Sequence, residues 1–327
     1  MKKYLIIISL LCLYVYSYSK DEMATANFYN LKNMSMGNST FTTDATDMAL
    51  FTNPASMALI SDGKFTILGV SSCINDEGSD MSSTIIDIAT EDKNFATDAE
   101  ALDYLKKKQA EVKGKTFSGF TNANAVSYTG KNFGFGIYSN MVITNFEITS
   151  DVRPKIILKG EEKFEIPFGM SFSVGKTKHL HLGASLRYIN IAQFDATGDN
   201  AITATKLMNN STGSDLINGS LDHGFGLNIG SAYTFPNGNT NIGLGLQNAW
   251  SSIEKYKLTD SISASDILSG GSDKIGTYKL MPNLRLGVTT KPLKWVEVTG
   301  EIDNLLSKNI DGIDDTDDKD IYKKIHF

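Results

Sequence analysis

The chain has 327 residues, a formal net charge of −6 and two cysteines, Cys12 and Cys73. This length allows one large β domain or two domains of ordinary size. The acidic balance argues against a nucleic-acid partner, because such partners are held mainly by basic side chains on their phosphates.

The N-terminus, residues 1–19, has the features of a cleaved export signal. Two lysines precede an apolar run from Tyr4 to Tyr16, and the small-x-small pattern Ser17-Tyr18-Ser19 follows. We expect cleavage before Lys20. A permanent transmembrane anchor is the alternative, but the run is short against the roughly 20 residues that a spanning helix needs. The mature chain would keep only Cys73 and so have no internal disulfide.

The stretch FTNPASMAL, Phe51 to Leu59, predicts a short helical segment. Pro54 restricts Asn53 to an extended or turn conformation. The Asn53 side chain can then cap the first free N–H groups, and Pro54 suits the first helical position because it has no N–H to satisfy. We expect one or two compact turns that end near Leu59.

Residues 94–113 predict a helix inserted between the first two strands. Thr97 is a candidate N-cap with Glu100 three residues later, and Gly114 ends the pattern. The apolar stripe consists of Ala101, Leu102 and Leu105. The charged face consists of Lys106, Lys107, Lys108 and Glu111, which predicts solvent exposure. Folding into or across the mouth of a barrel is the alternative placement.

Most of the remaining chain alternates between apolar and polar residues. In FEIPFGMSFSVG, residues 164–175, six apolar residues fall on one face. In HLHLGASLRY, residues 179–188, the leucines oppose His181, Ser185 and Arg187. The run PNGN, Pro236 to Asn239, predicts a tight hairpin turn. The period-two pattern predicts about ten to twelve strands. The expected strands are residues 64–72, 117–129, 133–143, 164–175, 179–188, 224–235, 241–250, 278–290 and 294–303, with a last one from near 321.

Two architectures fit strands with one apolar and one polar face. A soluble sandwich packs the apolar faces inward against a second sheet. An outer-membrane barrel turns them outward to lipid and keeps a polar lumen. Several runs reach ten residues or more, which exceeds the usual sandwich strand of about five or six and suits a tilted membrane-crossing strand. Strand length and the export signal together favour the barrel.

No pattern in the chain predicts catalysis or a cofactor. His179 and His181 would share a strand face, but two ligands do not make a metal site, and we interpret them as polar lumen residues. The acidic run from Asp311 to Asp320 lacks the ligand spacing of an EF-hand loop. The string GMSFSVGKT, Gly169 to Thr177, misses the phosphate-loop spacing by one residue and is followed by a strand. We therefore expect no enzyme and no bound metal.

The segment from Met36 to Leu59 resembles the mature N-terminus of outer-membrane barrels of the long-chain fatty-acid transporter superfamily. That superfamily is FadL/TodX-like and includes PorV-like and conjugative-transfer TraF-like proteins. Asn38 and Ser56 stand where relatives have glycine. Later stretches, such as GLGLQNAW and VEVTGEIDNLL, are similar to late strands of PorV-like members. The positions that match the family motif are Met36, Gly37, Asp44, Asp47, Asn53, Pro54 and Ala55.

The resemblance implies an antiparallel transmembrane β-barrel of about 12 to 14 strands, as members of this superfamily form closed lipid-facing barrels. Residues 20–62 would form an N-terminal lumen plug, and residues 63–327 the barrel with its helical insertion. The motif residues would belong to the plug or gate. The implied function is passive passage of hydrophobic or amphipathic small molecules, such as fatty acids, across the outer membrane of a diderm bacterium. The implied partners are outer-membrane lipids and the barrel-assembly machinery. A structural or secretion-accessory role, with secretion components as partners and no transport, is the alternative.

Overall fold

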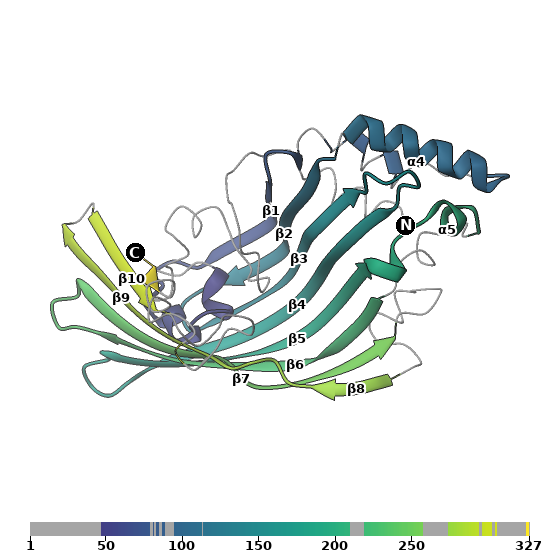
Figure 1. Ribbon diagram of the computed structural model, residues 1–327. Helices are drawn as coiled ribbons and strands as arrows, with labels where there is room; N and C mark the ends of the chain where they lie inside the picture. Colours follow the sequence, from purple (N-terminus) through teal and green to yellow (C-terminus); the bar gives the residue numbers. More distant parts are fainter. Residues whose placement is uncertain are drawn as a thin grey trace, which may run out of the picture.

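The computed structural model describes residues 47–78, 81, 83–84, 87–88, 95–112, 114–209, 219–257, 274–293, 296–302, 305 and 325–326. The described strands form one antiparallel sheet of 11 strands (Figure 1). Its order is β1-β2-β3-β4-β5-β6-β7-β9-β10-β11, and β8 also pairs with β7. The strands are β1 (Lys64–Ile74), β2 (Thr116–Thr129), β3 (Phe133–Ile148), β4 (Ile156–Val174), β5 (Leu180–Ala196), β6 (Gly219–Thr234), β7 (Thr240–Lys257), β8 (Lys274–Tyr278), β9 (Asn283–Leu293), β10 (Val296–Ile302) and β11 (Ile325–His326). The prediction of an antiparallel all-β fold is confirmed.

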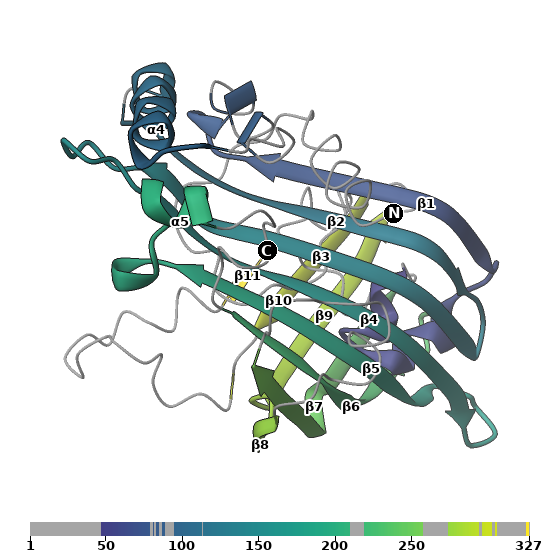
Figure 2. The same cartoon turned by 90° about the vertical axis from the view of Figure 1, so that its right-hand side faces the viewer.

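The sheet is strongly curved, and two short helices lie on its concave side (Figures 1 and 2). These are the 3₁₀ helices η1 (Asp47–Leu50) and η2 (Pro54–Leu59). We call the face that contacts them the inner face and the opposite one the outer face. Among the described residues, no pairing joins β1 to β10 or β11. None of the described helices is long and apolar enough to cross a membrane.

The connections differ in length between the two ends of the sheet. At one end the hairpins are short, with residues 130–132, 175–179 and 235–239 joining consecutive strands. The predicted turn at Pro236–Asn239 is present, with Gly238 at φ +69° and its N–H donating to the Phe235 carbonyl at 2.8 Å. At the other end, residues 75–115 and 197–218 connect the strands. These connections contain the α-helices Asp98–Val112 and Ala204–Asn209. The sheet therefore has a short-turn end and a long-loop end.

The predicted helical insertion is present as α4 (Asp98–Val112). The Glu100 N–H donates to Thr97 Oγ1 at 3.3 Å, which makes Thr97 the N-cap. The Glu100 side chain reaches back one residue further than in a capping box, since Oε2 accepts from the Ala96 N–H at 2.9 Å. Gly114 follows the helix at φ +72°, a left-handed conformation that glycine adopts at no steric cost.

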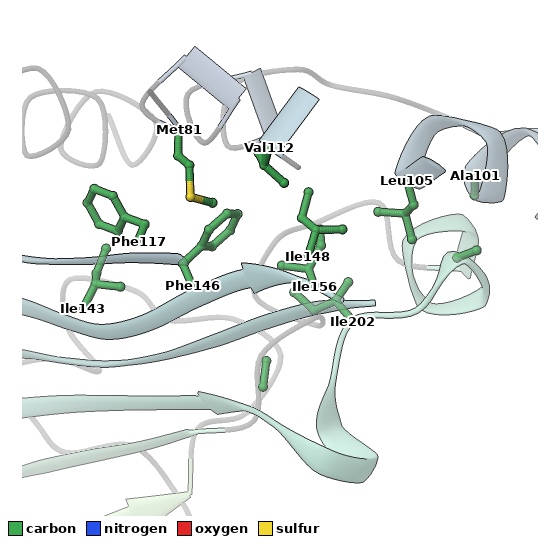
Figure 3. Packing of buried hydrophobic residues seen from close by; sticks show 12 residues of the cluster. Met81, Ala101, Leu105, Val112, Phe117, Ile143, Phe146, Ile148, Ile156 and Ile202 are labelled. Atoms are coloured by element: carbon green, nitrogen blue, oxygen red, sulfur yellow. The ribbon is translucent and has the colours of Figure 1, made fainter. Parts of the chain in front are cut away.

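A cluster of apolar side chains holds α4 and the short helix α5 (Ala204–Asn209) at the long-loop end of the sheet. Figure 3 shows Ala101 and Leu105 above the strands, with Phe146, Ile148 and Ile156 rising from the sheet beneath the helical segments. The β3 and β4 members of this cluster belong to the outer face, since Ile156 and the outward Phe168 are an even number of residues apart on β4. The insertion is therefore packed against the outer face rather than across the inner one.

The prediction that the charged face of α4 is exposed to solvent is wrong for Lys108. The Lys108 side chain is 6% exposed, and its Nζ lies 2.7 Å from Asp87 Oδ2 and 2.9 Å from Glu111 Oε2. Burial disfavours the charged amine, but hydrogen bonds to the two carboxylates outweigh burial and raise the pKa of Lys108 above its usual range. The lysine is thus the centre of a local ion network that ties residue 87 to the helix.

Lys108→Ala is expected to lower the free energy of unfolding by about 1–2 kcal/mol, because two adjacent carboxylates lose their shared counter-ion while both stay partly solvated. Urea unfolding followed by circular dichroism would measure the change. Lys107→Ala removes the same side chain from an exposed position one residue away and is the matched control. Equal midpoints for the two variants would contradict a structural role for Lys108.

The predicted strand at residues 278–290 is divided. Tyr278 ends β8, Asn283 begins β9, and residues 279–282 lie between them outside the ladder. Pro282 has no N–H to contribute to a ladder, which explains the break beside it. The carbonyl of Met281 instead accepts a hydrogen bond from Asn248 Nδ2 at 3.0 Å, and the Leu280 N–H donates to Ser251 Oγ at 2.8 Å.

Candidate functional site

Residues 47–60, which we call the inner segment, take their shape from local polar contacts. The Asn53 side chain accepts a hydrogen bond from the Ala55 N–H at 3.2 Å, and Pro54 occupies the first turn of η2. The Ser56 hydroxyl donates to the Asn53 carbonyl at 2.7 Å. Just after η1, the Thr52 hydroxyl donates back to the Met48 carbonyl at 3.0 Å. The segment is therefore a compact pair of turns capped by its own side chains.

The inner segment buries its apolar side chains against the inner face of the sheet. Leu50 and Met57 are fully buried in a cluster with Tyr138 of β3. The rings of Phe51 and Tyr138 meet edge to face, with centroids 4.8 Å apart and planes at 88°. Burial of these side chains supplies the apolar part of the attachment.

Four glycines of the sheet give the inner segment its room. A Cβ atom on Gly183 would lie 2.4 Å from both Ala55 N and Pro54 C, which are backbone atoms. A Cβ on Gly230 would lie 1.9 Å from Asn53 Oδ1. Gly134 and Gly169 face Leu50 and Met57 in the same way, at 3.2–3.3 Å and 2.7–2.9 Å. Because the strands carry no side chain at these points, the segment lies directly on the sheet backbone.

Polar side chains of the sheet hold the backbone of the inner segment at its first turn. Ser185 Oγ donates to the Leu50 carbonyl at 2.5 Å. The Phe51 carbonyl accepts from Asn228 Nδ2 at 3.0 Å and from Gln247 Nε2 at 2.8 Å. These donors come from β5, β6 and β7, so three strands meet at two carbonyl groups. A buried carbonyl that loses such a donor costs about 1–3 kcal/mol, which makes the arrangement specific for this placement.

A bulge in β7 orients the Asn228 side chain that donates to the Phe51 carbonyl. Leu227 pairs with Trp250 and Ile229 with Leu246, so residues 247–249 bulge out of the ladder between β6 and β7. Asn248 takes a left-handed conformation there, with φ +52°. Its N–H donates to Asn228 Oδ1 at 2.9 Å, which leaves the Asn228 amino group facing the inner segment.

Charged side chains are buried on the inner face beside this network. Glu165 of β4 is fully buried, with Oε1 2.8 Å from Lys163 Nζ and Oε2 3.0 Å from Arg187 Nη1. Arg187 of β5 also donates from Nη2 to Asn248 Oδ1. A second buried pair joins Arg285 of β9 to Glu301 of β10. Buried ions need such partners because removal from water is costly.

The structure describes four of the seven predicted site residues. Met36, Gly37 and Asp44 lie outside the described residues. Asp47 begins η1, and Asn53, Pro54 and Ala55 are buried at the start of η2 on the inner face. Their role in gating stays a prediction. The signal region 1–19 and the acidic run at 311–320 also lie outside the described residues.

Sequence reasoning did not single out the side chains that hold the inner segment. Ser185 and Arg187 belong to the polar face of a predicted strand, and Asn228 to another, so the period-two pattern placed them on one side of the sheet. The pattern carries no information on which polar residue faces which. Gln247 belongs to the polar face of a third predicted strand. Asn248 depends on the bulge, which the spacing of residues does not predict.

The two histidines do not form a pair on one strand. His179 lies in the turn before β5. His181 is buried on the inner face, where Nδ1 is 2.9 Å from Ser173 Oγ and Nε2 is 3.2 Å from Thr234 Oγ1. Among the described residues, no group of three or more His, Cys, Asp or Glu side chains is placed to hold a metal ion.

Comparison with known proteins gives no assignment: the chain matches no protein-family model, no curated protein and no solved structure. Function must therefore be argued from the residues of the sheet and its inner segment.

Proposed function

We propose that the chain is an outer-membrane β-barrel of the long-chain fatty-acid transporter superfamily. In this proposal it lets hydrophobic or amphipathic small molecules pass by diffusion, and the inner segment acts as the gate. The observation that carries the proposal is the distribution of side chains: large apolar groups are exposed on the outer face, while polar and charged groups are buried on the inner face.

The exposed apolar side chains form a band on the outer face, from the short turns to the middle of the strands. A water-soluble protein rarely leaves such a contiguous surface open, whereas a lipid-facing barrel requires it. On β4 the band runs from Ile166 to Val174, nine residues, close to the roughly 9–11 that a tilted strand needs. The band consists of Phe65, Ile67, Val70, Phe133, Phe135, Ile166, Phe168, Met170, Phe172, Val174, Leu186, Phe225, Ile229, Ile242, Leu244, Trp250, Leu286, Val288 and Val298.

The band has a polar limit toward the long-loop end. There the outer face carries Glu162, Asn190 and His223 at neighbouring positions of three strands. Short turns at one end and long connections at the other are also typical of outer-membrane barrels. Both features support a membrane orientation with the short turns on the periplasmic side.

The attachment of the inner segment supports a gating role. Two short helical turns rest on the sheet through a small apolar cluster and a few side-chain hydrogen bonds, without pairing into the ladder. Such a segment can leave its place while the strands stay paired, because local opening requires only those contacts to break. Its departure would free the inner face between β3 and β7.

Heat-modifiable gel mobility and fractionation of outer membranes test the barrel. We expect the folded protein to migrate differently from the boiled one and to remain with the outer membrane. A monomeric periplasmic product that stays soluble without detergent would contradict the proposal.

Deletion of residues 20–60 tests the gate. Liposomes that contain the deletion variant are expected to take up a fluorescent aliphatic probe faster than liposomes with the intact chain, because the contacts on the inner face are lost. Empty liposomes and a charged, membrane-impermeant sugar phosphate are the controls. Equal uptake with intact and deleted protein would contradict gating by this segment.

A secretion-accessory scaffold is the second candidate. The observation that favours it is the packed helical unit at the long-loop end, where α4 and α5 build the larger apolar cluster of the described chain. Transport needs no such unit, whereas a docking platform does. Removal of α4 with retention of probe uptake, together with loss of a co-purifying secretion component, would support the scaffold.

A further inference from the structure

Asp222 of β6 is a buried carboxylate with one oxygen that accepts no hydrogen bond from the described residues. It is 1% exposed and lies on the inner face, an even number of residues from Asn228 on the same strand. Tyr278 of β8 donates its hydroxyl to Oδ2 at 2.8 Å, whereas Oδ1 has no hydrogen-bond partner. A buried carboxylate oxygen without a donor is costly, so Oδ1 is a candidate contact for a ligand that donates hydrogen bonds.

The charged side chains around Asp222 do not neutralise this oxygen. Lys255 stands opposite Asp222 in the ladder between β6 and β7, but its amine is not a partner of Oδ1. Lys163, two strands away on β4, is paired with Glu165 at 2.8 Å. Glu161 of β4 adds a negative charge and is close enough to the Tyr278 hydroxyl to interact with it electrostatically. Within the described part of the chain, Asp222 therefore has no fixed counter-ion.

Apolar side chains border the carboxylate. Ile191 of β5 pairs with Asp222 and belongs to a buried cluster with Ile253 of β7. Tyr278 and Leu280 pack on this cluster and are only half-buried, so part of the apolar surface stays open. An anionic atom beside an aliphatic and aromatic surface suits an organic cation with an apolar chain.

The ligand atoms available here favour an ammonium group over a metal ion. Hard cations bind several oxygen ligands at once. Asp222 offers one free oxygen, and the described residues bring no group of three or more His, Cys, Asp or Glu side chains together around it. A primary ammonium satisfies Oδ1 with a single charge-assisted N–H···O bond, and its other N–H groups can bond to water.

We propose that Asp222 binds the ammonium group of an amphipathic amine, whose alkyl chain lies on the surface of Ile191, Tyr278 and Leu280. The site is on the long-loop side of the contacts with the inner segment, six residues along β6 from Asn228. The inference rests on the proposed function, because it names one class among the molecules that the barrel would admit.

The test measures binding to the full chain in lipid nanodiscs by calorimetry. The probes are n-hexylammonium and 1-hexanol, which share the alkyl chain and differ in the charge of the end group. Empty nanodiscs give the background from partitioning into lipid. We expect hexylammonium to bind and 1-hexanol to stay at background. Asp222→Asn keeps the size of the side chain and removes its charge, so it should weaken hexylammonium binding at least tenfold.

Two further variants separate the site from general effects on folding. Lys255→Met removes the cation opposite Asp222 and should tighten hexylammonium binding severalfold, a gain that misfolding does not produce. Glu254→Gln removes a carboxylate from the outer face of β7, one residue away from Lys255, and should bind hexylammonium as the intact chain does.

Equal hexylammonium affinity in Asp222→Asn and the intact chain would overturn the site, and so would unchanged affinity in Lys255→Met. These measurements do not depend on transport. Failure of liposome uptake alone would remove the proposed function and leave the site standing, whereas uptake of an aliphatic probe without hexylammonium binding would remove the site alone.

Discussion

Glu165→Ala is expected to lower the free energy of unfolding by about 3–5 kcal/mol, since removal of one partner leaves buried charge without compensation. The carboxylate is fully buried and is the shared counter-ion of Lys163 and Arg187, at 2.8 and 3.0 Å. Without it, two cations remain close together on the inner face. Urea unfolding of the protein refolded into lipid vesicles, followed by circular dichroism and gel mobility, measures the loss.

The matched control for this prediction lies on the same strand and the same face. Glu161 is four residues away, half-buried, and 3.3 Å from Gln193 Nε2. Glu161→Ala is expected to change stability by less than about 1 kcal/mol, because its hydrogen bond with Gln193 is exposed to solvent. The double variant Glu165→Ala/Arg187→Met should recover part of the loss, since it removes one of the stranded cations. Equal stability of the two single variants would mean that water screens the Glu165 cluster.

The strand pattern could be predicted from the sequence because alternation reports which face a side chain occupies. FEIPFGMSFSVG separated Phe168 and Phe172 from Glu165 and Ser171, and the structure exposes the first two and buries the last two. The extent of β4 could not be read in this way. The strand begins at Ile156, well before the alternating run. It also continues through Pro167, although the pairing with β3 passes from Glu165 to Phe168 without Ile166 or Pro167. Neighbouring strands compensate for local signals that would end an isolated strand.

The inner segment shows the same division between local and distant information. The cap of η2 follows from Asn53 and Pro54 alone, and the expected turns are present. The partner of the Asn53 amino group is the Ser231 carbonyl, 178 residues away in the chain. Asn248, in the bulge, is likewise hydrogen-bonded to Asn228 and Arg187, which lie on other strands. The helix pattern predicts solvent exposure for Lys108, because that pattern holds no information on Asp87 outside the helix. Contacts between distant residues decide the site, and one sequence does not contain them.

Gly183→Val is expected to open the proposed gate while the sheet remains intact. Even the Cβ of the new side chain would lie 2.4 Å from backbone atoms of Pro54 and Ala55, which cannot move aside as a flexible side chain can. Overpacking of this kind costs about 1–3 kcal/mol, and the cost falls on the seated state of the inner segment. A shift of that size changes a two-state population roughly 5–150-fold. Probe uptake by liposomes should therefore rise toward the rate of the variant without residues 20–60.

Gly276→Val provides the control for the same substitution. Gly276 lies in β8, its backbone is compatible with a side chain, and no atom of the described residues lies within 4 Å of an added Cβ. This variant should keep both its heat-modifiable mobility and the uptake rate of the intact chain. The comparison separates the gate from the sheet, because both variants add the same apolar group to a strand. If Gly183→Val retains the folded mobility and amide hydrogen exchange at residues 47–60 rises while uptake stays unchanged, the inner segment leaves its place without opening a path, and the scaffold becomes the better account of this protein.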